Sequence, residues 1–151
     1  MIDSFYSIGI SHWNCPLEIR ERFGIDKQQS IDFIKELKSL GGSAFSVSTC
    51  NRTQVFAHNI NVHQLKEKFI KHSGNQTDNF EKYGFVLEDH EAIQNLFEVS
   101  TGIDSQILGD LQIFSQVKEG VDLAKNNGCI NSNMDRLLQF VFQANKEVQS
   151  F

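Results

Sequence analysis

Two short runs of alternating apolar residues flank a polar stretch near residue 50, and this arrangement constrains the fold more than any other feature of the sequence. The first run covers residues 44–48 and the second covers residues 54–57. Alternation with a period of two is typical of strands that bury one face. Because a connection this short joins antiparallel strands, the pattern predicts a β-hairpin whose tip carries Ser48-Thr49-Cys50-Asn51-Arg52-Thr53.

The segments around the hairpin carry further strand and helix patterns. Residues 5–10 and 83–87 are expected to be strands. Helical periodicity runs from Asp26 to Gly41-Gly42 and again over residues 62–70. The apolar face of the first helix is formed by Phe33, Ile34, Leu37 and Leu40. The order strand, helix, strand, strand, helix, strand predicts an α+β chain with a ferredoxin-like βαββαβ fold, in which both helices cover one face of a four-stranded antiparallel sheet.

The remainder of the chain has only helical patterns. Asp89 is expected to cap a helix, the next helix ends at Asn126-Asn127-Gly128, and Asn131 or Ser132 caps the last one. We therefore expect residues 1–88 to form a ferredoxin-like subdomain that carries the cysteine loop, and residues 89–151 to form a helical subdomain of the same domain. The last helix reaches the final residue without a stop signal, which indicates a fragment of a longer protein.

Composition limits the compartment and the partners. A net charge of −5 argues against strong nonspecific attraction to a polyanion, although a local basic patch is compatible with it. Three cysteines without a C-x-x-C pair or a Cys/His cluster argue against a disulfide framework and a zinc site, and they fit a reducing cytoplasm. No apolar run is long enough to span a membrane, and the amino terminus has no signal pattern.

Cys50 is the first candidate for chemistry, because a thiol is already strongly nucleophilic near neutral pH. Arg52 could favour its thiolate, or could clamp a substrate carboxylate with its planar fork of donors. The alternative is that Cys50 is an inert core thiol. His12 is either a hydrogen-bonded structural residue or an auxiliary functional group. We expect Arg20 and Arg22 to be solvated ion-pair partners.

Three groups of residues together resemble the N-terminal catalytic domain of the glutamyl-tRNA reductase family, and the resemblance covers the whole chain. The hexamer around Cys50, followed some fifty residues later by a Gly-Ile-Asp-Ser block, is the most specific feature. The three groups are Gly9-Ile10-Ser11-His12 with Pro16-Leu17-Glu18-Ile19-Arg20-Glu21, then Ser48-Thr49-Cys50-Asn51-Arg52-Thr53, and then Gly102-Ile103-Asp104-Ser105 with Leu108-Gly109, Gln112-Ile113 and Gln116-Val117-Lys118.

The resemblance implies an oxidoreductase of tetrapyrrole (porphyrin) biosynthesis. In this family the cysteine, here Cys50, attacks the ester of glutamyl-tRNA to form a thioester, which NADPH reduces to glutamate-1-semialdehyde. NADPH would be bound by a domain absent from this chain, since no Gly-x-Gly-x-x-Gly follows a strand. The implied partners are glutamyl-tRNA, the aminomutase that acts next, and a second subunit in the full-length homodimer. The residues expected around the glutamyl group are Thr49, Asn51, Arg52, Ser105, Asp110, Leu111, Gln112 and Gln116.

Three departures from the family pattern leave the function open. Asn95 stands where the family usually has a histidine thought to assist the chemistry, and an amide cannot exchange a proton in that role. Gln54 and Asp110 both replace a usual glutamate. The retained Cys50 and Arg52 favour a catalytic domain. The alternative is a noncatalytic module that keeps the fold and binds glutamyl-tRNA or a partner enzyme.

Overall fold

The computed structural model describes residues 4–102 and 111–149, which form four strands and a set of mostly short helices. In chain order the elements are β1 (Phe5–Ser11), α1 (Leu17–Arg20), the 3₁₀ turn η1 (Glu21–Phe23), α2 (Lys27–Ser39), β2 (Ser43–Thr49), β3 (Arg52–His58), α3 (Val62–His72), α4 (Thr77–Tyr83), β4 (Phe85–Glu88), α5 (His90–Thr101), α6 (Leu111–Asn126) and α7 (Ser132–Gln149).

The strands form one sheet in the order β2-β3-β1-β4. Each neighbouring pair is antiparallel, with Phe5 opposite His58 between β1 and β3. Helix α2 connects β1 to β2, and β3 lies between these two strands. Helix α3 lies in the connection from β3 to β4, and β1 lies between those two strands. This interleaving of two βαβ units is the ferredoxin-like topology, so the predicted fold class is confirmed.

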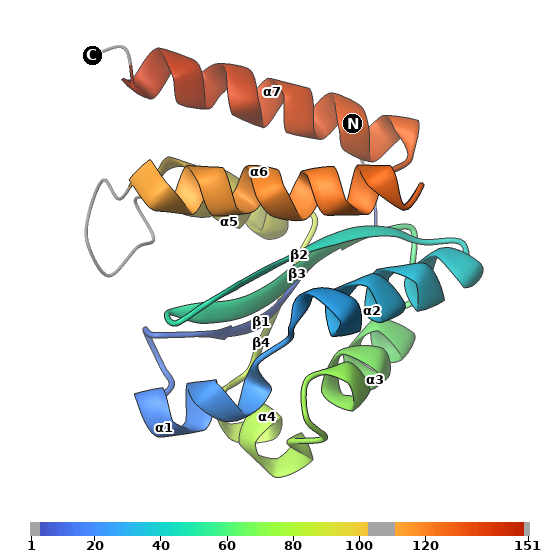
Figure 1. Cartoon of the computed structure of the whole chain (residues 1–151), viewed down its shortest axis with the longest axis vertical. Helices are drawn as coiled ribbons and strands as arrows, with labels where there is room; N and C mark the ends of the chain where they lie inside the picture. Colours follow the sequence, from blue (N-terminus) through green and yellow to red (C-terminus); the bar gives the residue numbers. More distant parts are fainter. Residues whose placement is uncertain (1–3, 103–110, 150–151) are drawn as a thin grey trace.

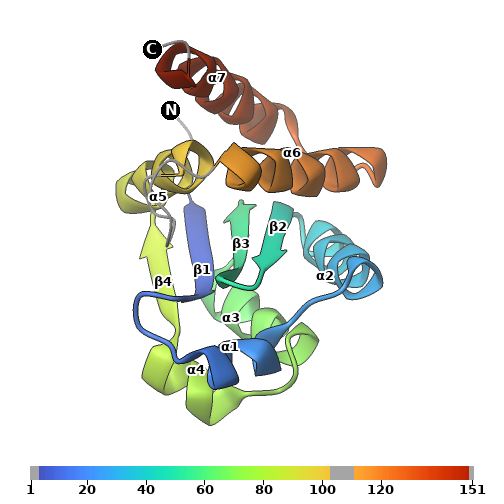
Figure 2. The same ribbon diagram turned by 60° about the vertical axis from the view of Figure 1, so that its left-hand side comes forward.

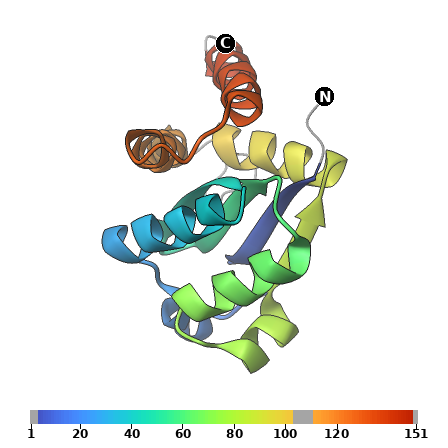
Figure 3. The same cartoon turned by 90° about the vertical axis from the view of Figure 1, so that its right-hand side faces the viewer.

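Helices cover both faces of the sheet (Figure 1). Helices α2 and α3 pack on one face, as predicted, while α5 and α6 pack on β1 and β2 from the other side (Figures 2 and 3). Helix α7 packs on α5 and lies farther from the sheet. Every residue of β3 is buried as a result, including its polar ones. A strand in this position has no solvent-facing side, so its polar side chains must find partners inside the protein.

Helix α6 approaches the backbone of β2 closely through Gly120. A Cβ atom on Gly120 would lie 2.1 Å from the carbonyl oxygen of Ser46, a distance that no side chain tolerates. Only glycine therefore permits this helix to rest directly on the strand. The spacing between α6 and β2 is fixed by a residue without a side chain.

Most of the predicted helix starts are confirmed. Asp26 and Gln29 form a capping box at α2, and Asn131 caps α7 through its Oδ1, which accepts from the backbone N of Met134 at 2.8 Å. The prediction for Asp89 was wrong in its mechanism. Asp89 occupies the N-cap position of α5, but its Oδ1 accepts from the backbone N of Phe5 at 3.2 Å and makes no cap bond.

Two further expectations need correction. Leu40 does not extend the buried face of α2, because it lies at the C-cap and is 40% exposed. Helix α4 was not expected. It is anchored by Phe80, whose ring lies 5.6 Å from that of Phe69, and it delays the start of the last strand to Phe85.

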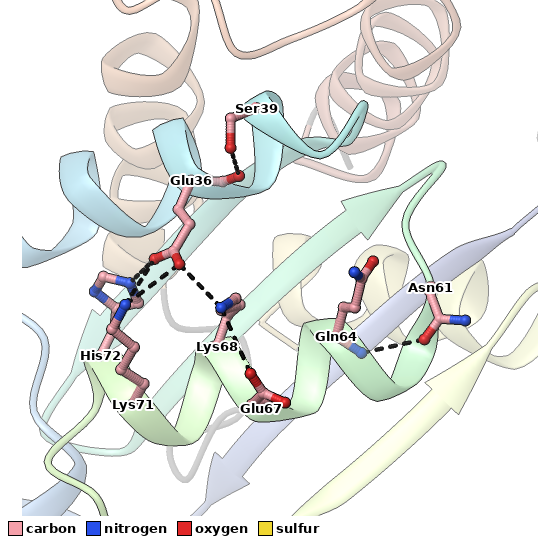
Figure 4. Close-up of polar contacts among 8 residues, drawn as sticks. All are labelled: Glu36, Ser39, Asn61, Gln64, Glu67, Lys68, Lys71 and His72. Atoms are coloured by element: carbon pink, nitrogen blue, oxygen red, sulfur yellow. Dashed lines mark hydrogen bonds and ion pairs between the residues drawn. The ribbon is translucent and has the colours of Figure 1, made fainter.

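A cluster of charged residues joins α2 to α3 (Figure 4). The carboxylate of Glu36 contacts His72 Nε2 at 2.5 Å, Lys68 Nζ at 3.1 Å and Lys71 Nζ at 3.3 Å. The hydrogen bond from His72, with smaller contributions from the two lysines, lowers the pKa of Glu36 from 4.5 to about 2. The His72 ring also stacks on Phe33 at 5.2 Å, so the cluster sits at the edge of the core.

We expect Glu36→Gln to lower the free energy of unfolding at pH 7 by about 1 kcal/mol, since the neutral amide loses its attraction to the cations. A depressed pKa contributes stability that is fully present above 4.5 and is lost as the pH falls through about 2. Urea denaturation should therefore show the difference from the native chain shrinking over that range. The control is Glu67→Gln, since Glu67 is 74% exposed and pairs with Lys68 at 3.5 Å; an equal effect at both sites would contradict the assignment.

Candidate active site at the β2–β3 turn

Cys50 and Asn51 form the two-residue turn between β2 and β3, as the sequence predicts. Thr49 is the last residue of β2 and pairs with Arg52, the first residue of β3. The hydroxyl oxygen of Thr49 accepts from the backbone N of Asn51 at 3.1 Å, which closes the turn. The Cys50 thiol is exposed, so it is not an inert core thiol.

The loop after β1 is attached to this turn. The backbone N of His12 donates to the carbonyl oxygen of Asn51 at 2.9 Å, which places His12 beside the turn. Arg20 links the two segments further. Its Nη1 donates to the carbonyl oxygen of Cys15 at 2.6 Å and its Nε donates to that of Cys50 at 3.4 Å. The prediction that Arg20 is a solvated ion-pair partner missed this role, because backbone acceptors leave no signal in the sequence.

The other two thiols lie in different surroundings. Cys15 and Cys129 are buried, and burial raises the pKa of each thiol above 9.0. Positive charge partly opposes this effect, from Arg20 at Cys15 and from Lys38 and Lys35 at Cys129. A buried thiol with a raised pKa is a poor nucleophile, because little thiolate is present and reagents cannot reach it.

We expect limiting iodoacetamide at pH 7 to alkylate Cys50 first, at least tenfold faster than Cys15 or Cys129. The difference follows from exposure and from the raised pKa of the two buried thiols. Mass-spectrometric mapping of the native protein measures the order, and labelling in urea is the control in which the three rates should converge. Preferential labelling of a buried cysteine in the native protein would refute the expectation.

Arg52 lies in the interior, with 2% of its surface exposed. Its Nη1 donates to Oε1 of Gln54 at 3.2 Å. The amide Nε2 of Gln54 then donates to the hydroxyl of Ser7 at 2.7 Å and to Oδ1 of Asn95, and the Ser7 hydroxyl donates to the same Asn95 oxygen at 2.8 Å. These bonds form a continuous polar network from β3 through β1 to α5, which we call the Arg52 network; Arg52, Gln54 and Ser7 are buried and Asn95 is half-buried.

The direction of each bond in the Arg52 network is fixed from one end. A guanidinium has only donors, so Gln54 must present its oxygen to Arg52 and its NH₂ group to Ser7 and Asn95. Asn95 therefore acts as an acceptor of two hydrogen bonds. Gly9 pairs with Gln54 in the sheet, and a Cβ atom there would lie 2.3 Å from the carbonyl oxygen of Thr53. The backbones of β1 and β3 therefore approach too closely at Gly9 for any other residue there.

A cavity of about 550 Å³ opens at the β2 edge of the sheet. It lies between the start of α2, strand β2 and helix α6, and it contains Ser48, Gln116 and Gly120. Ser48 is two residues before Cys50, and Gln116 lies one helical turn before Gly120 on α6. The structure thus brings Gln116 next to the strand that leads to Cys50. The charged lining residues are Asp26, Lys27, Glu119 and Asp122.

Of the remaining predicted site residues, the structure describes only those in the first turn of α6. Gln112 is exposed, one turn before Gln116. Leu111 is the first residue of α6, and the structure describes only its backbone. Ser105 and Asp110 lie outside the described residues. Within residues 4–102 and 111–149, no group of three or more His, Cys, Asp or Glu side chains is placed to hold a metal ion. No helix in those same ranges is long and apolar enough to cross a bilayer.

Residues 8–151 match the family model described as "Glutamyl-tRNAGlu reductase, N-terminal domain". The chain belongs to this family. It is 34% identical over 148 residues to "Glutamyl-tRNA reductase 2" of Flavobacterium johnsoniae, covering 97% of this chain and 34% of that protein. It is 37% identical over 149 residues to "Glutamyl-tRNA reductase" of Flavobacterium psychrophilum, covering 98% of this chain and 36% of the relative.

A solved structure named "Glutamyl-tRNA Reductase from Methanopyrus kandleri" has the same fold, with a TM-score of 0.80 and 21% sequence identity. The match covers 99% of this chain and 35% of that one. The resemblance noted from the sequence motifs is therefore confirmed. The chain spans about a third of the length of the glutamyl-tRNA reductases it matches.

Proposed function

We propose that this chain is the acyl-accepting part of a glutamyl-tRNA reductase, in which Cys50 attacks the ester of glutamyl-tRNA. The observation that carries the proposal is the exposed thiol of Cys50 at the tip of the β2–β3 turn, in a member of this family. The Cys50 sulfur bonds to the glutamyl carbonyl carbon, and the bond from that carbon to the terminal ribose oxygen breaks. The ribose oxygen takes up a proton as the tRNA leaves, and a thioester remains on the protein.

A thioester suits the reduction that follows in the proposed reaction. Sulfur donates electron density poorly into a carbonyl, so the thioester accepts hydride more readily than the oxygen ester it replaces. NADPH would supply that hydride and release glutamate-1-semialdehyde, a precursor in tetrapyrrole biosynthesis. The described residues do not fit a dinucleotide, because every described strand pair is antiparallel and the sequence has no Gly-x-Gly-x-x-Gly. We place NADPH in a domain outside this chain, so the chain's own chemistry ends at the thioester.

We propose that Arg52 binds the α-carboxylate of the glutamyl group, since it lies two residues after Cys50 and a planar guanidinium matches the two oxygens of a carboxylate. Asn95 is an auxiliary residue that acts through this network, and His12 supports the turn through its backbone. We further propose that residues 1–88 and 89–151 are two subdomains of one catalytic domain, that the full-length protein is a cytoplasmic homodimer, and that it contacts the aminomutase. The remaining proposed contacts to the glutamyl group are Thr49, Asn51, Ser105, Asp110, Leu111, Gln112 and Gln116.

The proposal is tested by incubating the chain with glutamyl-tRNA that carries radiolabelled glutamate. We expect loss of the ester and transfer of label to protein, abolished in Cys50→Ala and independent of NADPH. Semialdehyde should not form at any cofactor concentration. Formation of semialdehyde by this chain alone would contradict the proposal that reduction needs a domain outside it. Ester loss that survives Cys50→Ala would contradict the assignment of Cys50 as the nucleophile.

A noncatalytic binding module remains the second candidate. The observation that favours it is that Gln54 and Asn95 contribute amides to the Arg52 network and Ser7 contributes a hydroxyl, and none of these three side chains exchanges a proton near neutral pH. A module of this kind would bind glutamyl-tRNA, for example in a filter-retention assay, and would leave its ester intact. The same incubation therefore separates the two functions.

A further inference from the structure

Trp13 is the only tryptophan in the chain, and 62% of its surface is exposed. It lies in the loop after β1, next to His12, whose ring is 4.7 Å away. Most of the other large aromatic side chains pack in or against the core, including Phe5, Phe45 and Phe56. A tryptophan that remains in solvent gives up the burial that usually stabilises it, so its position calls for an explanation.

The loop that carries Trp13 is held in place by its backbone. The backbone N of Cys15 donates to the carbonyl oxygen of Ser11 at 3.2 Å, which closes a turn with Trp13 inside it. Cys15 itself is buried, and Arg20 binds its carbonyl oxygen. Trp13 therefore lies on a turn whose backbone is held at both ends, with most of its surface exposed.

The same bonds fix Trp13 relative to Cys50. The backbone N of His12 donates to the carbonyl oxygen of Asn51. Trp13 directly follows His12, and Cys50 directly precedes Asn51. With about 3.8 Å between consecutive Cα atoms and about 5.5 Å across the bonded pair, the Cα atoms of Trp13 and Cys50 are at most about 13 Å apart. Arg20 spans the two loops and places positive charge between them.

We propose that Trp13 stacks on the 3′-terminal nucleobase of the aminoacyl-tRNA whose ester Cys50 attacks. This inference rests on the proposed function, because the ester sits on the ribose of that same terminal nucleotide. The base of this nucleotide must therefore lie near the turn when Cys50 attacks the ester. Stacking also suits a chain with a net charge of −5, since an aromatic face binds a base without relying on attraction to phosphates.

Fluorescence provides a test that does not depend on turnover, because Trp13 is the sole indole in the chain. Titration with uncharged tRNA should quench the emission, and tRNA that lacks its terminal adenosine should quench it much less. Equal quenching by both RNAs, or none by either, would overturn the proposal. A change in emission that tracks protein concentration without RNA would assign Trp13 to contact between copies of the chain, and that outcome would also overturn it.

Kinetics then separate this proposal from the proposed function. In Trp13→Ala, the glutamyl-tRNA concentration for half-maximal ester loss should rise about 10- to 100-fold with the maximal rate changed less than twofold, and Trp13→Phe should recover most of the loss. A small glutamate thioester without a nucleoside should react equally well with the native chain and Trp13→Ala.

Phe140→Ala is the matched control, since Phe140 is 66% exposed on α7. Unchanged half-saturation in Trp13→Ala would overturn the stacking proposal, whereas absence of any Cys50-dependent reaction would overturn the proposed function and leave the fluorescence result standing.

Discussion

The Arg52→Lys variant is expected to form the Cys50 thioester about 100-fold more slowly than the native chain. A guanidinium has two parallel donors that match the two oxygens of a carboxylate, whereas a lysine has a single point of charge on a flexible stem. Loss of a bidentate contact of this kind is worth about 2–3 kcal/mol, which corresponds to the expected change in rate. Single-turnover transfer of labelled glutamate measures it.

The control for this variant must account for the burial of Arg52. Arg136→Lys makes the same change at an exposed position on α7 and should leave the rate unaltered. Urea denaturation of Arg52→Lys reports whether the fold survives at the assay temperature. Equal transfer rates in a folded Arg52→Lys protein would show that Arg52 supplies only charge, or nothing, to glutamyl recognition.

The Gln54→Met variant is expected to be less stable than the native chain by about 3 kcal/mol. Methionine has nearly the same shape as glutamine but removes the acceptor that faces Arg52 and the donors that face Ser7 and Asn95. Buried polar groups that lose their partners cost about 1–3 kcal/mol each, and a buried charge costs more. Urea denaturation at pH 7 measures the difference.

Gln94 offers a matched comparison on the exposed side of α5, where its amide donates to Glu98 at 3.1 Å. Gln94→Met should change the free energy of unfolding by less than about 0.5 kcal/mol. If Gln54→Met were equally mild, the Arg52 network would add no net stability. Its role in holding Arg52 would then have to be judged from thioester formation alone.

The order of strands and helices could be predicted because each element has its own periodicity. The hairpin around Cys50 and the helix from Asp26 follow directly from alternation and from capping residues. Helix α4 has only seven residues, too few for a helical repeat to stand out from its polar neighbours. Asp89 was placed correctly at a helix start, but its actual partner, Phe5, is distant in the sequence and belongs to another strand.

The candidate site was predicted in part, for a similar reason. Cys50 at a turn follows from local pattern, and so does its neighbour Arg52. The burial of Arg52 does not, because β3 is covered on both faces and the alternation that normally marks a solvent side is lost. Ser7 and Arg20 were missed since their roles depend on acceptors and donors from segments far away in the chain.

The close contact of Gly120 with the backbone of β2 has a consequence for anyone who searches for active residues by random mutagenesis. Any side chain at Gly120 would push α6 away from Ser46 and would displace Gln116, one turn earlier on the same helix. A screen for lost activity would therefore return Gly120 beside Cys50, although glycine has no group that takes part in a reaction. Such a screen would mistake a residue that sets the position of α6 for a catalytic residue. Measuring folding alongside activity would distinguish the two.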